Sequence, residues 1–130
     1  MCIRDRLRAA LAGGRAVALF PEGTTDAGHE MLPFRPSLFA SLYPALPGVR
    51  VQPVAIDYGP LAPEIAWVGE EGAGANAARV MARKGGIPVT LRFLDPIDPV
   101  AAGDRKTLAA QAQAAVAVAL GASSSDGDGL

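Results

Sequence analysis

The sequence predicts an α/β fold in which a mostly parallel sheet is flanked by helices. Short apolar or alternating runs, typical of strands, take turns along the chain with segments that favour helices. The apolar run 16–20 shows no polar alternation, which is the pattern of a strand buried on both faces inside a parallel sheet.

Each element is predicted from its local pattern. Strands are expected where apolar residues run together or alternate, at 16–20, 49–58, 64–68 and 88–94. Helices are expected where helix-forming residues end at glycine or proline, at 6–11, 37–42, 76–83 and 105–120. Pro36 suits the first turn of the second helix, and Pro53 indicates an edge position or a bulge in its strand.

The last helix is the best defined. Asp104 is a suitable N-cap residue for it. Its expected apolar face consists of Leu108, Ala112, Ala115, Val116 and Leu120. Residues 1–120 are therefore predicted to fold, whereas 121–130, with serines and Gly-Asp pairs, are predicted to be a disordered tail. Because a partial sheet leaves an unpaired edge and an uncovered apolar face, we expect poor solubility or self-association.

Composition excludes several classes of protein. Half of the 130 residues are hydrophobic, which excludes a disordered chain, and the net charge of -1 argues against a nucleic-acid binder. Cys2 is the only cysteine, so no intrachain disulfide or cysteine-based zinc site can form. No apolar run approaches the ~18 residues of a spanning helix, and no signal-peptide core follows the charged N-terminus.

The loop after the run 16–20 carries the clearest functional signal. Gly23 allows a ligand to approach the backbone closely, while Thr24 and Thr25 offer hydroxyl groups to an anionic or polyhydroxylated head group. Glu22 can accept hydrogen bonds from a substrate hydroxyl or hold a cation, and Arg35 can supply positive charge for an anion. An ordinary strand-to-helix turn with a surface glutamate explains the same spacing about as well.

Other chemically active residues are better explained without a function. His29, with Asp26 and Glu30 nearby, is favoured as a solvated loop residue over a catalytic base or a metal ligand. Four arginines near the N-terminus can meet anionic lipid head groups, each worth ~1 kcal/mol, although a solvated helix face is slightly favoured. They are Arg4, Arg6, Arg8 and Arg15.

Three stretches resemble a known family. Phe-Pro-Glu-Gly-Thr-Thr at 20–25 resembles the third signature block of the glycerolipid (1-acylglycerol-3-phosphate) acyltransferases, and Val-Gln-Pro-Val-Ala-Ile at 51–56 resembles their fourth. Leu-Pro-Phe-Arg-Pro-Ser-Leu-Phe at 32–39 also fits, because a Lys or Arg commonly follows the aromatic residue in this family. On this resemblance, residues 1–120 are the C-terminal part of an acyltransferase domain, an incomplete glycerolipid acyltransferase fold.

The resemblance implies transfer of a fatty acyl chain from acyl-CoA or acyl carrier protein to the hydroxyl of 1-acyl-sn-glycerol-3-phosphate, with no further cofactor and no metal. Glu22, Gly23 and Thr24 match the family's head-group block, whereas Thr25 stands where phosphate-acceptor members often have Arg. The related lyso-ornithine lipid acyltransferases are therefore an alternative. Either enzyme is expected at the cytoplasmic face of the membrane, as a peripheral protein or one anchored by a segment N-terminal to this sequence.

The family's catalytic block is not found in this sequence. In the family, a His that activates the acceptor hydroxyl is followed five positions later by an Asp, and this pair precedes the third block by tens of residues. Only 19 residues precede Phe20, none of them His, and five positions after His29 is Phe34. We therefore assign no catalytic residue and predict that the chain alone is inactive. A non-catalytic lipid- or protein-binding module on the same sheet is the rival interpretation.

Overall fold

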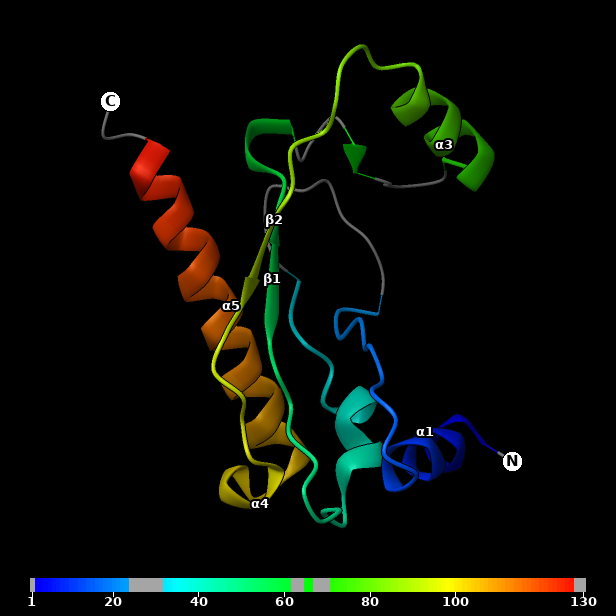
Figure 1. Cartoon of the computed structure of the whole chain (residues 1–130), viewed down its shortest axis with the longest axis vertical. Helices are drawn as coiled ribbons and strands as arrows, with labels where there is room; N and C mark the ends of the chain where they lie inside the picture. Colours follow the sequence, from blue (N-terminus) through cyan, green and yellow to red (C-terminus); the bar gives the residue numbers. More distant parts are fainter. Residues whose placement is uncertain (1, 24–31, 62–64, 67–70, 128–130) are drawn as a thin grey trace.

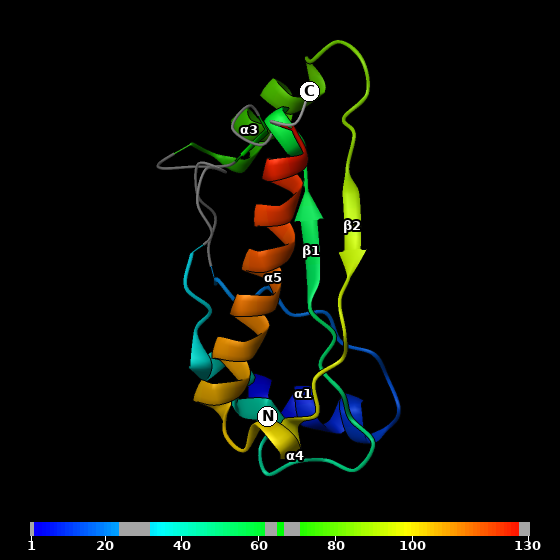
Figure 2. The same ribbon diagram turned by 90° about the vertical axis from the view of Figure 1, so that its left-hand side faces the viewer.

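The computed structural model describes residues 2–23, 32–61, 65–66 and 71–127. Helices at one end of the molecule meet a pair of strands that runs beside a long helix (Figures 1 and 2). The elements follow one another along the chain as α1 (Ile3–Ala12), the 3₁₀ helix η1 (Pro36–Leu42), β1 (Val54–Asp57), the 3₁₀ helix η2 (Gly59–Leu61), α3 (Ala73–Met81), β2 (Thr90–Phe93), α4 (Pro99–Ala102) and α5 (Arg105–Gly127).

The sheet of the described residues has two strands and is antiparallel. β1 pairs with β2 in the register Val54 opposite Phe93 and Ile56 opposite Leu91. The class of mixed helix and sheet is as predicted, but for this part of the chain the expectation of a mostly parallel sheet is wrong. The direction of pairing depends on where the connection 58–89 returns the chain, and local sequence patterns do not determine the path of that connection.

The run 16–20 is extended but is not a strand in the described structure. No described residue pairs with it, and it is not buried as predicted, since Val17 and Leu19 are each 38% exposed and Phe20 is 76% exposed. The apolar pattern is that of a central strand, but an extended segment forms a strand only when its backbone N–H and C=O groups bond to a neighbouring strand. No neighbouring strand lies beside this run in the described part of the chain.

Several predicted elements form with shifted boundaries. The second predicted strand is shortened to β1 because Pro53 stands before it, although Val51 still forms an isolated bridge with Ile97. The predicted strand 64–68 lies mostly outside the described residues, and Ile65 and Ala66 are not in a strand. Between the last predicted strand and the last predicted helix, the chain forms the short helix α4, which sequence patterns did not indicate.

The long helix α5 begins as predicted and ends later. The carboxylate Oδ1 of Asp104 accepts a hydrogen bond from the Thr107 N–H at 2.7 Å, which confirms the N-cap. The helix continues to Gly127 rather than Leu120, a correction to the predicted start of the tail. An established helix gains one hydrogen bond for each added residue, and no proline interrupts the alanines and serines that follow.

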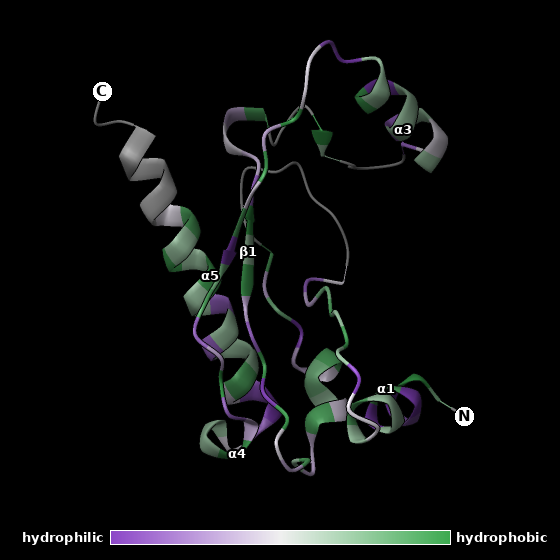
Figure 3. Ribbon diagram, in the orientation of Figure 1, coloured by the Kyte–Doolittle hydropathy of each residue, from purple (hydrophilic) through white to green (hydrophobic). Residues whose placement is uncertain are grey.

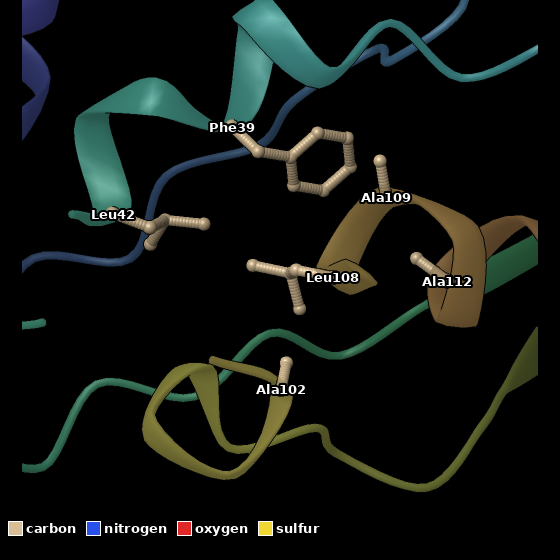
Figure 4. Close-up of a cluster of buried hydrophobic side chains, with 6 residues drawn as sticks. All are labelled: Phe39, Leu42, Ala102, Leu108, Ala109 and Ala112. Atoms are coloured by element: carbon tan, nitrogen blue, oxygen red, sulfur yellow. The ribbon is translucent and has the colours of Figure 1, made fainter. Parts of the chain in front are cut away.

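The core lies where α5 meets η1 and α4. Leu108 is fully buried and Ala109 and Ala112 nearly so, facing the buried side chains of Phe39 and Leu42 (Figure 4). Further apolar residues pack around this cluster: Leu11, Phe34, Tyr43, Val49, Val51 and Ile97. Burial of the predicted α5 face is thus confirmed at Leu108, Ala112 and Val116, whereas Ala115 and Leu120 are half-buried. Ala109, which was not predicted to be buried, joins the core, and the small side chains let η1 approach the helix closely.

Among the described residues, one face of the sheet is largely exposed. α5 packs against β1 on the side of the fully buried Ala55. Alternation along the strands places Val54, Ile56, Leu91 and Phe93 on the opposite side, where they are 36–65% exposed; we call these four residues the open apolar face. Figure 3 shows the hydropathy of each residue along the ribbon. The chain's accessible surface of 8729 Å² also exceeds the ~6,500 Å² expected for a compact monomer of this mass.

Candidate functional site

The turn at the start of the candidate loop has the geometry that its sequence requires. The Gly23 N–H donates to the Phe20 carbonyl at 3.2 Å, and Gly23 has φ +75°, a value that strains any residue with a Cβ. Glu22 is half-buried directly before it. The turn therefore directs the Glu22 side chain back toward the segment that follows the loop.

Glu22 binds the protein's own backbone. Its Oε2 accepts a hydrogen bond from the Leu32 N–H at 2.7 Å, a short contact typical of a charged acceptor. Glu22 and Leu32 flank residues 24–31, so this bond ties together the two ends of that loop. At least one carboxylate oxygen thus has a structural role that the sequence did not indicate.

Arg35 lies across the turn from Glu22. Its backbone N–H donates to the Pro21 carbonyl at 2.9 Å, so the two segments are joined a second time. The Arg35 side chain passes over Gly23, where a Cβ added to the glycine would stand 3.3 Å from its Cδ and Nε. Arg35 is exposed, and among the described residues no hydrogen bond or ion pair engages its guanidinium group. The glycine provides the space in which this cation lies.

These residues border an open hollow of about 460 Å³, lined by Glu22 and residues 32–37. Its lining is largely apolar and includes one acidic and one basic residue, Glu22 and Arg35. Such a surface suits a molecule that joins an apolar chain to a charged head group.

The structure brings together three of the five predicted site residues: Glu22, Gly23 and Arg35. Thr24 and Thr25 lie outside the described residues, and so does the loop of His29. In the described part of the chain, no three His, Cys, Asp or Glu side chains form a group that could hold a metal ion.

Sequence reasoning missed one residue of this region, Gln113 on α5. Its Oε1 accepts a hydrogen bond from the Phe34 N–H at 2.9 Å, although 79 positions separate the two residues. The only local signal was a polar side chain beside the apolar face of the helix, and many surface residues share that signal.

Two of the N-terminal arginines have partners within the protein. A guanidinium nitrogen of Arg4 donates to the Tyr43 carbonyl at 2.8 Å, and one of Arg8 donates to the carbonyls of Ser41 and Pro44 at 3.0 and 2.9 Å. These bonds fasten α1 to the end of η1. For Arg4 and Arg8 the favoured interpretation, a merely solvated helix face, is therefore wrong.

The shifted pKa values belong to residues that do not line the hollow. Burial, together with the nearby carboxylates of Asp104 and Asp98, raises the pKa of the Tyr43 hydroxyl, which donates to the Pro99 carbonyl at 2.9 Å. Hydrogen bonds from Thr107 lower the pKa of Asp104.

No helix among the described residues has both the length and the apolar composition to cross a membrane.

Comparison with known proteins agrees with the sequence blocks. Residues 2–57 match the family model described as Acyltransferase. The chain is 35% identical to the lyso-ornithine lipid O-acyltransferase of Brucella abortus (strain 2308), over 76% of this chain and 42% of that protein. It is 39% identical to the protein of the same name from Pseudomonas aeruginosa, over 85% and 42%, and 34% identical to that from Rhizobium meliloti, over 76% and 38%.

The chain spans about two fifths of the length of these curated relatives. No solved structure matches it significantly. The family match covers the turn at Glu22 and Gly23, Arg35, and the strand β1 that follows them. By these blocks and these relatives, the chain belongs to the acyltransferase family.

Proposed function

We propose that this chain is the acceptor-binding part of a longer acyltransferase. That enzyme would move a fatty acyl chain from a thioester, acyl-CoA or acyl carrier protein, to the hydroxyl of a lysolipid. The observation that carries the proposal is the largely apolar hollow lined in part by Arg35, whose side chain lies against Gly23. An acyl chain can lie along such an apolar lining while an anionic head group pairs with the guanidinium of Arg35.

The reaction needs a base that this chain does not provide in a suitable setting. Attack of a hydroxyl on a thioester carbonyl requires removal of the hydroxyl proton. The only histidine of the sequence, His29, lacks the Asp five positions later that the family's catalytic pair has. We therefore place the base in another part of the longer protein. The role of this chain is to hold and orient the acceptor.

Two features support lyso-ornithine lipid as the acceptor. The curated relatives described above carry that substrate in their names. The loop 24–31 contains no Lys or Arg but has Asp26 and Glu30, so Arg35 supplies the positive charge near the turn. One cation balances the single carboxylate of ornithine, whose amino group also tolerates acidic neighbours. A phosphate monoester, with ≈ -1.5 to -2 charges, is a poorer match.

The same proposal accounts for the unpaired run 16–20. In the longer protein we expect this run to be a strand within a larger, mostly parallel sheet. The enzyme would work at the cytoplasmic face of the membrane, where its lipid acceptor resides.

A lipid-panel assay tests the function. The full-length protein would be offered a labelled acyl thioester with either lyso-ornithine lipid or 1-acyl-sn-glycerol-3-phosphate, and product formation would be measured. We expect faster acylation of lyso-ornithine lipid and a large loss of this activity in the Arg35→Gln variant. Preferential acylation of 1-acyl-sn-glycerol-3-phosphate would overturn the choice of acceptor. Absence of product with every lysolipid tested would instead favour the rival, a non-catalytic binding module.

A further inference from the structure

The segment Leu32–Arg35, which borders the hollow, belongs to no helix or strand. Its backbone N–H groups must therefore find acceptors elsewhere. Pro33 has no N–H, and the other three are all engaged. Leu32 donates to the Glu22 carboxylate, Phe34 to the side-chain oxygen of Gln113, and Arg35 to the Pro21 carbonyl.

We propose that Gln113 is a positioning residue for the acceptor site, holding the Phe34 N–H and thereby fixing where Arg35 presents its guanidinium group. This inference rests on the proposed function and adds to it a residue outside the sequence blocks. Gln113 does not line the hollow, so it acts through the loop rather than on the lipid.

Gln113 is well placed for this role because its helix is fixed. Ala109 and Ala112 are buried on the side of α5 that meets η1, and Gln113 follows directly at the edge of that face. The Phe34 side chain packs against the same core. The Phe34 N–H and its acceptor are therefore held at a half-buried contact, where an unmade hydrogen bond is costly because water replaces it poorly.

The other two hydrogen bonds cannot replace this one. Glu22 and Pro21 both belong to the turn at the start of the loop, so their bonds join the loop's ends to each other. Among the described residues, only the bond to Gln113 connects the segment Leu32–Arg35 to α5 through a polar contact. Without it, the segment is held against the helix by apolar packing alone.

The test uses the full-length protein and two matched variants. Gln113→Met keeps the length of the side chain but removes the acceptor, and Gln113→Glu restores an acceptor oxygen. Gln111→Met is the control, because Gln111 is exposed on the same helix. Binding of short-chain, monomeric lyso-ornithine lipid and short-chain lysophosphatidate would be measured by calorimetry. Exchange of the Phe34 amide hydrogen and the thermal midpoint would be measured on the same samples.

We expect Gln113→Met to weaken lipid binding about tenfold and to accelerate exchange of the Phe34 amide. Gln113→Glu should recover most of the affinity, and Gln111→Met should match the wild-type chain. Wild-type affinity in Gln113→Met would overturn the positioning role, and so would an equal loss in Gln113→Glu. If the wild-type protein binds neither lipid but Gln113→Met still accelerates exchange of the Phe34 amide, the proposed function fails. In that case only the hydrogen bond between Gln113 and Phe34 is supported.

Discussion

Replacement of Glu22 tests whether its carboxylate mainly closes the loop, by accepting the Leu32 N–H, or mainly serves a bound ligand. In Glu22→Ala, the Leu32 N–H loses the acceptor that lies 2.7 Å away. In Glu22→Gln, a neutral side-chain oxygen of the same reach remains. If the carboxylate mainly closes the loop, the alanine variant should be clearly less stable and the glutamine variant only slightly so.

The magnitude follows from the contact. A hydrogen bond to a charged group contributes about 1.5–3 kcal/mol, and the partial exposure of Glu22 places the expected loss in Glu22→Ala near the lower end, at about 1–2 kcal/mol. For a chain of this size that corresponds to about 3–8 °C in the thermal midpoint. Glu22→Gln should lose less than half as much, because an acceptor oxygen remains.

Urea unfolding followed by circular dichroism would give the free energies of unfolding, and exchange of the Leu32 amide would report the bond itself. Equal stability of Glu22→Ala and the wild-type chain, with no change at the Leu32 amide, would refute the structural role. Equal losses in the alanine and glutamine variants would show that charge, and not the acceptor position, is what the fold requires.

Three further predictions concern other parts of the chain. Gly23→Ala should both strain the backbone at φ +75° and press on the Arg35 side chain, so lipid affinity should fall more than in Arg35→Lys, as calorimetry would show. Hydrogen bonds lower the pKa of Asp104 in the folded chain, so its ionised form stabilises the fold at pH values above the unfolded-state pKa. This stabilisation is lost as the pH falls through the lower, folded-state pKa. Asp104→Asn should therefore flatten the acidic part of a stability-versus-pH curve. The open apolar face should drive self-association, so Phe93→Lys should raise the monomer fraction in size-exclusion chromatography more than Met81→Lys, which changes an exposed residue on α3.

Local patterns predicted the elements whose causes are local. The cap at Asp104 and the apolar stripe of α5 depend on residues three or four positions apart. The cap is confirmed, and so is burial of the stripe at Leu108, Ala112 and Val116. The 3₁₀ helix after Pro36 follows from the fixed φ of proline and also forms where expected. In the candidate site, Gly23 was predicted only to let a ligand approach the backbone; its positive φ of +75° and its contact with the Arg35 side chain were not predicted from the sequence.

The features that sequence patterns could not predict depend on distant residues. The run 16–20 has the composition of a buried strand, but pairing requires a partner that its own residues do not specify. Glu22 was expected to face a ligand, and its contact with Leu32 depends on how the loop between them closes. The bond between Gln113 and Phe34 spans 79 positions, and only the packing of α5 brings the two together.

The two small residues of α5 next to Gln113 have a consequence for how specificity can change. Ala109 and Ala112 set how near the helix comes to η1, because a methyl group is all that each of them places in the buried space between the two elements. A bulkier side chain at either position would displace the helix and lengthen the contact between Gln113 and Phe34. Under the proposed function, the volume of the side chains at these two positions would therefore affect how the lipid head group is held, and substitutions that never touch a lipid could alter which lipid is bound.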